Sequence, residues 1–316
     1  MKIIDLHCDT FMKLFKNKNK KFKNNDYHID INKLIKGDSL AQFFAMFIYK
    51  NIDYEKKGYD SIFELTLDMI DYFHQQINKY DKVEFASDID DLNKNEKANK
   101  ISAFLTLEEG GVVGNDLNKI KILYETGVRA ITLTWNFPNT IGYPNCKEEY
   151  QSKGLTRFGK DAVRMMNDLG ILIDVSHLSD GGFYDVLEIS NDPFIATHSN
   201  ARNIHNHSRN LTDRMIKEIS ESGGVIGINF CAAFLAENEI SKISDILNHI
   251  NHIKKIGGAE SIAIGSDFDG IDCGMEIEDY SHIQKLVDAL KKNGYSEREI
   301  EQIAYKNAKR VIKQVL

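Results

Sequence analysis

The segment IIDLHCD, residues 3–9, joins an apolar run to two side chains that can bind a metal, His7 and Asp9. Continuous runs rich in Ile, Val, Phe and Thr are typical of strands that are buried on both faces of a sheet. Seven further segments share this pattern, and we predict that all eight are strands of one parallel sheet. The seven are LAQFFAMFI (residues 40–48), ISAFLTLEE (101–109), VRAITLTWN (128–136), ILIDVSH (171–177), FIATHS (194–199), GVIGINF (224–230) and SIAIGSDFD (261–269).

Helix-length segments separate these runs. Apolar residues at helical spacing predict helices at residues 64–78, 119–124, 158–169, 213–222 and 296–315, the last with Ser296 as its N-cap and Glu299 in capping-box position. Strands that alternate with helices in this way predict an α/β protein, a (β/α)8 TIM barrel formed by residues 1–316 as a single catalytic domain. The long connection at residues 136–156 is expected to form a wall or lid of a pocket.

Polar side chains end most of the predicted strands. Active sites of (β/α)8 barrels lie at the carboxyl ends of the strands, so these side chains are expected to meet at one mouth of the barrel. Imidazole and carboxylate groups together suit zinc, manganese or iron. The sequence therefore predicts a metal site there, formed from His7, Asp9, Glu108, His177 and His198, with Asp267 at the same mouth as a catalytic residue.

Alternatives exist for the first three of these residues. The spacing of His7 and Asp9 puts both side chains on one face of a strand and Cys8 on the other, in the barrel wall. A buried, hydrogen-bonded pair would explain that spacing equally well. Glu108 ends an apolar strand and needs a cation or another partner, since burying an unpaired carboxylate is costly. Its neighbour Glu109 is the alternative candidate for that role.

Two aspartates follow the eighth run, in GSDFDG. Asp267, at the strand end, is better placed to receive a proton from a metal-bound water, whereas Asp269 followed by Gly270 is typical of a turn. His205 and His207 follow the sixth run and are secondary candidates for lining the pocket. The other histidines are predicted to be ordinary surface residues, namely His28, His74, His249, His252 and His282.

The composition indicates a large soluble enzyme. Of the 316 residues, 42% are hydrophobic and 28% are charged, and the net charge of -7 argues against nucleic acid as a partner. The apolar runs are too short to cross a bilayer, so no membrane partner is expected. The first predicted strand begins at Ile3, which leaves no signal peptide, and the four cysteines form no CxxC pair. Reduced thiols and a cytoplasmic location are therefore expected.

Several stretches give the chain a family resemblance. It resembles the membrane dipeptidase (renal dipeptidase) family of zinc peptidases, within the amidohydrolase-like, metal-dependent hydrolases. The matching stretches follow the family's order and cover nearly the whole chain. They are IIDLHCDT (residues 3–10), LEEGG (107–111), GVRAITLTWN (127–136), GLTRFGKDAVRMMNDLGILIDVSH (154–177), ATHSNAR (196–202), SRNLTD (208–213) and IGSDFDG (264–270).

The resemblance implies a dipeptidase with two zinc ions, although ligands of this type also accept other divalent metals. His7 and Asp9 would hold one metal, and His177 and His198 the other. Glu108 rather than Glu109 would bridge both metals, because it aligns with the family pattern without a gap. Arg209, in SRNLTD, would bind the terminal carboxylate of the substrate through two parallel hydrogen bonds.

The implied mechanism uses a hydroxide that the two metals share, which attacks the peptide bond. Asp267 would take up the proton and return it to the leaving amine. The chain departs from the animal members of the family at Trp135, where they have a histidine credited with helping to stabilise the tetrahedral intermediate. Because an indole donates one N–H and cannot carry protons, the metal would have to hold the oxyanion alone or with help from another group. We place Trp135 and its neighbour Asn136 among the substrate-binding residues, and a place for Trp135 in the pocket wall or in the core stays open.

Two other functions remain open at this point. The same binuclear site could cleave another amide, a lactam or a lactone, or the chain could be a non-catalytic, ligand-binding descendant. Retention of every implied metal ligand together with Asp267 disfavours the second alternative. The expected partner is a small dipeptide, and the family resemblance adds a homodimer as a further expectation.

Overall fold

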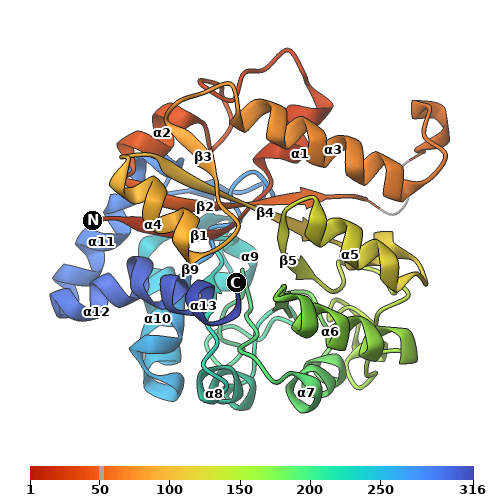
Figure 1. Ribbon diagram of the computed structural model, residues 1–316. Coiled ribbons are helices and arrows are strands. Elements are labelled where there is room, and N and C mark those ends of the chain that lie inside the picture. Colours follow the sequence, from red (N-terminus) through yellow and green to blue (C-terminus); the bar gives the residue numbers. More distant parts are fainter. Residues whose placement is uncertain (50–52) are drawn as a thin grey trace.

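The computed structural model describes residues 1–49 and 53–316, and helices surround a central parallel sheet in it (Figure 1). The sheet follows the order β6-β5-β4-β2-β1-β9-β7, and the short β3 pairs with the first half of β4. All pairs in this order are parallel. The strands are β1 (Ile3–Cys8), β2 (Ser39–Phe47), β3 (Val83–Phe85), β4 (Ile101–Glu108), β5 (Val128–Thr132), β6 (Leu172–Asp174), β7 (Ile226–Ile228) and β9 (Ile262–Ile264).

The predicted sixth strand, residues 194–199, forms isolated bridges rather than a continuous ladder. Ile195 N donates to the Ile173 carbonyl at 2.9 Å, and Ala196 N donates to the Val225 carbonyl at 3.1 Å. The segment thereby lies between β6 and β7 and joins the two ends of the sheet. With this segment in place, the eight predicted positions of the (β/α)8 barrel are all present.

Several strands are shorter than predicted, because buried carboxylates replace backbone partners at the carboxyl end of the barrel. Ser176 N donates to Asp174 Oδ1 at 3.0 Å, and Ser266 N donates to Asp5 Oδ1 at 2.9 Å. The backbone leaves the ladder at these points. The predicted runs 171–177 and 261–269 therefore shrink to β6 and β9. The runs 128–136 and 224–230 also shorten, to β5 and β7, and the residues beyond all four strands lie in loops.

Helices cover the outside of the sheet, and all five of the predicted helical segments are helical. The predicted C-terminal helix is divided by a π-helical turn at Gln302–Lys306, although the capping box of Ser296 and Glu299 is present. The helices are α1 (Thr10–Lys16), α2 (Ile31–Lys36), α3 (Ile62–Ile77), α4 (Ile89–Lys97), α5 (Leu117–Glu125), α6 (Arg157–Leu169), α7 (Asp180–Ile189), α8 (Asp213–Glu221), α9 (Ala232–Leu235), α10 (Ile243–Gly257), α11 (Gln284–Lys292), α12 (Glu297–Glu301) and α13 (Asn307–Val315).

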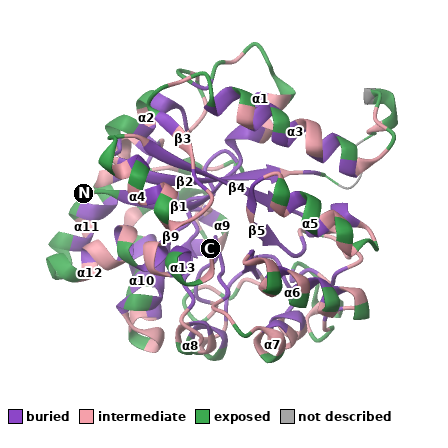
Figure 2. Ribbon diagram, in the orientation of Figure 1, coloured by how far each residue is buried: buried purple, intermediate pink, exposed green. Residues whose placement is uncertain are grey.

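Two apolar clusters stabilise the barrel. The larger one packs strand residues such as Leu105 and Ile173 among the helices, and Cys8 belongs to it, as strand alternation predicts. The smaller one includes Phe104 and Ile195 and extends to apolar side chains of α13. Buried residues accordingly occupy the central strands, while exposed ones lie on the outer faces of the helices (Figure 2). Burial of this kind is the main stabilising term for such a fold.

Three short strands were not predicted, because two or three residues are too few to show a hydrophobic periodicity. They are β3 and the parallel pair β8 (Ile240–Ser241) and β10 (Gly274–Met275). None of the helices within the described ranges is long and apolar enough to cross a membrane.

Gly265 allows the backbone after β9 to approach residue 197 closely. A Cβ at Gly265 would lie 1.8 Å from the Thr197 carbonyl oxygen, far inside contact distance. We expect Gly265→Ala to lower the free energy of unfolding by about 1–3 kcal/mol or more, the range for overpacked interiors. Urea unfolding measures this loss.

The matched control is Gly274→Ala, whose Cβ would meet Ile240 Cγ1 at an ordinary 3.4 Å. It should change stability by no more than a few tenths of a kcal/mol, roughly the range for exposed positions. Equal losses in both variants would contradict the steric argument.

Candidate metal centre

Glu108 lies at the end of β4 with only 3% of its surface exposed, and its two carboxylate oxygens face different histidines. Oε1 lies 3.1 Å from His177 Nε2 and 3.6 Å from His198 Nε2. Oε2 lies 3.6 Å from His7 Nε2. One carboxylate thus separates two groups of potential ligands, which is the geometry that a bridging ligand requires.

The first group consists of His7, Asp9 and Glu108. His7 Nε2 lies 3.4 Å from Asp9 Oδ2, so the pair that was predicted from its spacing does converge. The reason differs from simple strand alternation, because β1 ends at Cys8 and its register with β2 shifts between Asp5 and Cys8. Asp9 instead reaches the site as the residue that precedes α1.

The second group consists of Glu108, His177 and His198. The Nε2 atoms of the two histidines lie 3.0 Å apart. His177 Nδ1 lies 3.0 Å from Asn136 Oδ1 and, because an amide oxygen only accepts, this nitrogen carries the proton of the ring. In the neutral ring, Nε2 therefore presents a lone pair toward His198 and Glu108.

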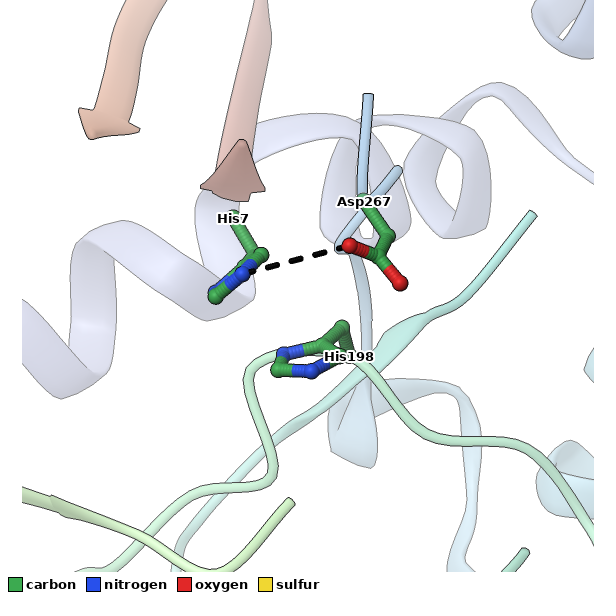
Figure 3. Close-up of side chains that lie close together, drawn as sticks. All are labelled: His7, His198 and Asp267. Carbon is green, nitrogen blue, oxygen red and sulfur yellow. Dashed lines mark ion pairs between the residues drawn. The ribbon is translucent and has the colours of Figure 1, made fainter. Parts of the chain in front are cut away.

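Asp267 lies beside both groups and completes a third cluster with His7 and His198 (Figure 3). Its Oδ1 is 4.0 Å from His7 Nε2, and its Oδ2 accepts a hydrogen bond from Asn229 Nδ2 at 2.9 Å. The residue has a φ of 61° and lies three positions beyond β9, whereas the sequence predicts it at the strand end.

The donor atoms fit divalent metal ions. His7 Nε2 and Asp9 Oδ1 are buried, and neither has a hydrogen-bond partner among the described residues. Buried polar atoms normally have partners, so these two indicate a ligand that proteins bind through nitrogen and oxygen. Three carboxylates and three imidazoles in one buried cluster suit zinc and other transition metals.

The pKa values of the cluster show the effect of burial. Burial raises the pKa of Asp9 to about 6, even though His7 opposes the shift, and it raises the pKa of Asp267 to about 7. Burial lowers the pKa of His177 to about 4, and the nearby Arg209 acts in the same direction.

Burial also lowers the pKa of His198, so His177 and His198 are neutral, the form in which imidazole binds a divalent cation. His7 differs, because burial lowers its pKa but Glu108 and Asp9 together raise it well above the usual value.

A cavity of about 420 Å³ opens onto this cluster. Asp9, Glu108, His177 and Asp267 form part of its lining, and so do the predicted substrate-binding residues Arg209, Trp135 and Asn136. Of the two histidines predicted as secondary candidates, His207 lines the cavity, whereas His205 is not among its lining residues. Cys146, from the long connection at residues 136–156, also contributes, so this connection forms a wall as predicted.

Glu109 has a different role from Glu108. It has a φ of 81°, and its carboxylate accepts hydrogen bonds from Trp135 N at 3.0 Å and Asn139 Nδ2 at 2.8 Å. These contacts hold the loops that follow β4 and β5. Glu108 is therefore the glutamate that faces the histidines.

Trp135 lies at the rim of the cavity among aromatic side chains. Its ring centroid lies 4.9 Å from that of Phe47, 5.7 Å from that of Tyr49 and 6.2 Å from that of His177. The indole thus lies between an aromatic wall of the cavity and His177 of the candidate metal centre.

Sequence reasoning was wrong about His249 and missed the residues that orient the cluster. His249 is fully buried in α10; its Nδ1 accepts from Ala201 N, and its Nε2 bonds to the Leu235 carbonyl. A histidine on a helix can thus be internal when both ring nitrogens find backbone partners. Asn229 was missed because no spacing rule links residue 229 to Asp267.

Comparison with known sequences agrees with this geometry. A family model described as membrane dipeptidase (peptidase family M19) matches residues 1–316. An uncharacterized protein in the pqqA 5' region of Klebsiella pneumoniae is 33% identical over 230 residues, covering 69% of this chain and 84% of that protein. An uncharacterized dipeptidase of Schizosaccharomyces pombe is 32% identical over 305 residues, covering 90% of this chain and 72% of the yeast protein.

Solved structures share the fold. A metallo peptidase from Rhodobacter sphaeroides, crystallised with a phosphinate mimic of the dipeptide L-Ala-D-Ala, has a TM-score of 0.91 at 24% identity. The match covers 100% of this chain and 99% of that one. From the family match over residues 1–316 and relatives above 30% identity, it follows that this chain is a metal-dependent hydrolase of the membrane dipeptidase family, peptidase family M19.

Proposed function

We propose that this metallo-dipeptidase hydrolyses free dipeptides with two zinc ions that share Glu108. His7 and Asp9 would hold one ion, and His177 and His198 the other. The observation that carries the proposal is the placement of the two Glu108 oxygens, one facing His7 and the other facing the second pair of histidines. Zinc at these positions would supply Lewis acidity, which activates a water molecule and polarises the carbonyl group of the substrate.

Asp267 would move the proton in this reaction. Its Oδ2 is engaged by Asn229, so Oδ1, which faces His7, is the atom available to accept a proton from the attacking water. Burial raises the pKa of Asp267 to about 7 in the metal-free cluster, a shift that favours a carboxylate able to accept this proton and return it to the leaving amine. The same carboxylate would thus act first as a general base and then as a general acid.

Arg209 would bind the carboxylate of the substrate. The side chain is buried, its Nη1 donates to the Ser176 carbonyl at 2.9 Å, and its Nε has no hydrogen-bond partner among the described residues. Nor does Arg209 form an ion pair with any side chain in the part of the chain that the structure describes. A buried guanidinium that lacks an anionic partner is costly, and a free carboxylate in the cavity would supply that partner.

The contact with Arg209 and the size of the cavity together limit which peptides can bind. Arg209 and the metal ligands line the same cavity of about 420 Å³, which is at the small end for ligand sites. A substrate whose terminal carboxylate bonds to Arg209 has its peptide bond at a defined distance from Glu108. The contact with Arg209 disfavours peptides with a blocked carboxyl end, and the small cavity disfavours peptides extended at the amino end, so we infer that free dipeptides are preferred.

A substrate panel with Arg209→Met tests the proposed function. The variant should lower kcat/KM for a free dipeptide by roughly 10- to 150-fold, because hydrogen bonds to charged groups contribute about 1.5–3 kcal/mol. It should change hydrolysis of the same dipeptide with a C-terminal amide far less. The panel should also contain N-acyl amino acids, lactams and lactones, and the zinc-loaded and manganese-loaded enzymes should both be assayed.

Arg164→Met is the matched control, since Arg164 pairs with Asp161 on α6 at 3.0 Å and does not line the cavity. Its kcat/KM for free dipeptides should stay close to that of the wild type. A metal-loaded wild type that hydrolyses lactones or N-acyl amino acids but no dipeptide would contradict the proposal.

A further inference from the structure

Asp174 is a fully buried carboxylate at the end of β6 that the proposed reaction does not use. It accepts hydrogen bonds from three neighbouring segments of the barrel. Oδ1 bonds to Ser176 N, Ser176 Oγ and Thr197 N, and Oδ2 bonds to Thr132 Oγ1 at 2.6 Å and Thr197 Oγ1 at 2.5 Å. A carboxylate with so many donors is held in one orientation and is acceptor-only.

Thr197 connects this carboxylate to the metal-binding cluster. Its hydroxyl group has one hydrogen, which it donates to Asp174 Oδ2. The same oxygen lies 2.8 Å from His198 Nδ1. Because the hydroxyl hydrogen is already committed, Thr197 Oγ1 can only accept from His198, so the ring must carry its proton on Nδ1. His198 Nε2 is then unprotonated and presents a lone pair.

We propose that Asp174 and Thr197 are positioning residues that fix the Nδ1–H tautomer of His198 and aim its Nε2 lone pair at a metal shared with His177 and Glu108. The inference rests on the proposed metal centre. In other metal sites, residues that hydrogen-bond to a ligating histidine fix the orientation and the tautomer of its imidazole. The inference gives this role to Asp174 and Thr197.

The alternative tautomer, with the proton on Nε2, would let the ligand atoms hydrogen-bond to one another in place of a metal. A proton on His198 Nε2 would point at His177 Nε2, 3.0 Å away, or at Glu108 Oε1, 3.6 Å away. Either hydrogen bond would satisfy the atoms that the cation needs. The hydroxyl oxygen of Thr197 disfavours this tautomer, because it offers an acceptor to His198 Nδ1 and not to His198 Nε2.

The two histidines of this group have separate supports. His177 Nδ1 bonds to Asn136 Oδ1 in the loop after β5, whereas His198 Nδ1 bonds to Thr197. Thr197 Oγ1 also lies 3.5 Å from His7 Nδ1, a much longer contact than the 2.8 Å to His198 Nδ1. Loss of the Thr197 hydroxyl should therefore weaken mainly the metal that His198 binds, and to a smaller extent the metal that His7 and Asp9 bind.

Three variants test the inference: Thr197→Val removes the hydroxyl at nearly constant shape, Thr197→Ser keeps it, and Thr132→Val is the matched control. Thr132 donates to the same Asp174 oxygen as Thr197 does, but no hydrogen bond joins it to His198. The first readout is the ¹⁵N NMR spectrum of the histidine rings in metal-free protein, with His198 assigned from the His198→Gln spectrum. The second is a titration of metal-free protein with zinc.

We expect the Nδ1–H tautomer of His198 in the wild type, Thr197→Ser and Thr132→Val, and its loss in Thr197→Val. In Thr197→Val one of two zinc equivalents should bind about 10- to 100-fold more weakly, and the affinity of the other should change much less. An Nε2–H tautomer in the wild type, or unchanged zinc binding in folded Thr197→Val, would overturn the inference.

The two readouts also separate this inference from the proposed function. Failure of the wild type to bind zinc would contradict the proposed metal centre, whereas the ring spectrum would still decide the tautomer. If Thr197→Val does not fold, the wild-type spectrum still decides the tautomer, and equal zinc affinities of the wild type and Thr197→Ser remain required.

Discussion

Replacing Glu108 with glutamine should remove at least one metal and nearly all hydrolysis. An amide has one oxygen and one NH₂ group, so it cannot offer an acceptor both to the side of His7 and to the side of His177. A metal supplies several kcal/mol of transition-state stabilisation, and each 1.4 kcal/mol corresponds to a factor of ten in rate. We therefore expect kcat to fall by at least about 10³-fold, together with a zinc content below two per chain by atomic absorption.

Glu109→Gln is the control for this change, since it alters the adjacent residue in the same way. Glu109 bonds to the loops after β4 and β5 rather than to the histidines, so the variant should be less stable to heat but keep two zinc ions per chain. The reverse pattern, with metal lost in Glu109→Gln and kept in Glu108→Gln, would mean that the bridging glutamate has been assigned to the wrong residue.

Replacing Asp267 with asparagine should separate catalysis from metal binding. The amide keeps the shape of the carboxylate but cannot accept a proton at pH 7. Loss of a general acid–base residue costs about 10²–10⁴-fold in rate, and we expect kcat to fall within this range. The zinc content should stay close to two per chain, because the five proposed metal ligands are unchanged.

Asp272→Asn makes the same chemical change nearby, at an exposed residue that also lines the cavity. Its kcat should stay within about threefold of the wild-type value, because exposed substitutions of this kind have small effects. If Asp267→Asn were as active as Asp272→Asn, another group would have to carry the proton.

The barrel and its eight strand positions could be predicted because buried parallel strands are apolar along their whole length. The runs 40–48 and 101–109 correspond closely to β2 and β4, which pair through seven consecutive residues. Where polar side chains such as Asp174 take over the backbone bonds, the strands end early, and apolar character alone does not reveal this. Residues 194–199 form bridges only, for the same reason.

Convergence of the six predicted polar residues follows from parallel topology, which brings all the carboxyl ends of the strands to one mouth. The orienting contacts do not follow from it. Thr197 bonds to Asp174 and Asn229 bonds to Asp267, and each pair depends on how two segments far apart in sequence are placed. No periodicity encodes such a pairing.

The amino-acid sequence by itself determined the barrel class, the family resemblance and the set of residues at the mouth, because hydrophobic runs and short motifs are local properties of the chain. Only the tertiary structure decided which glutamate faces the histidines, that Asp9 acts from the residue before α1, and that His249 is internal. These outcomes depend on distances and hydrogen-bond donors supplied by remote segments, which exist only once the barrel has closed.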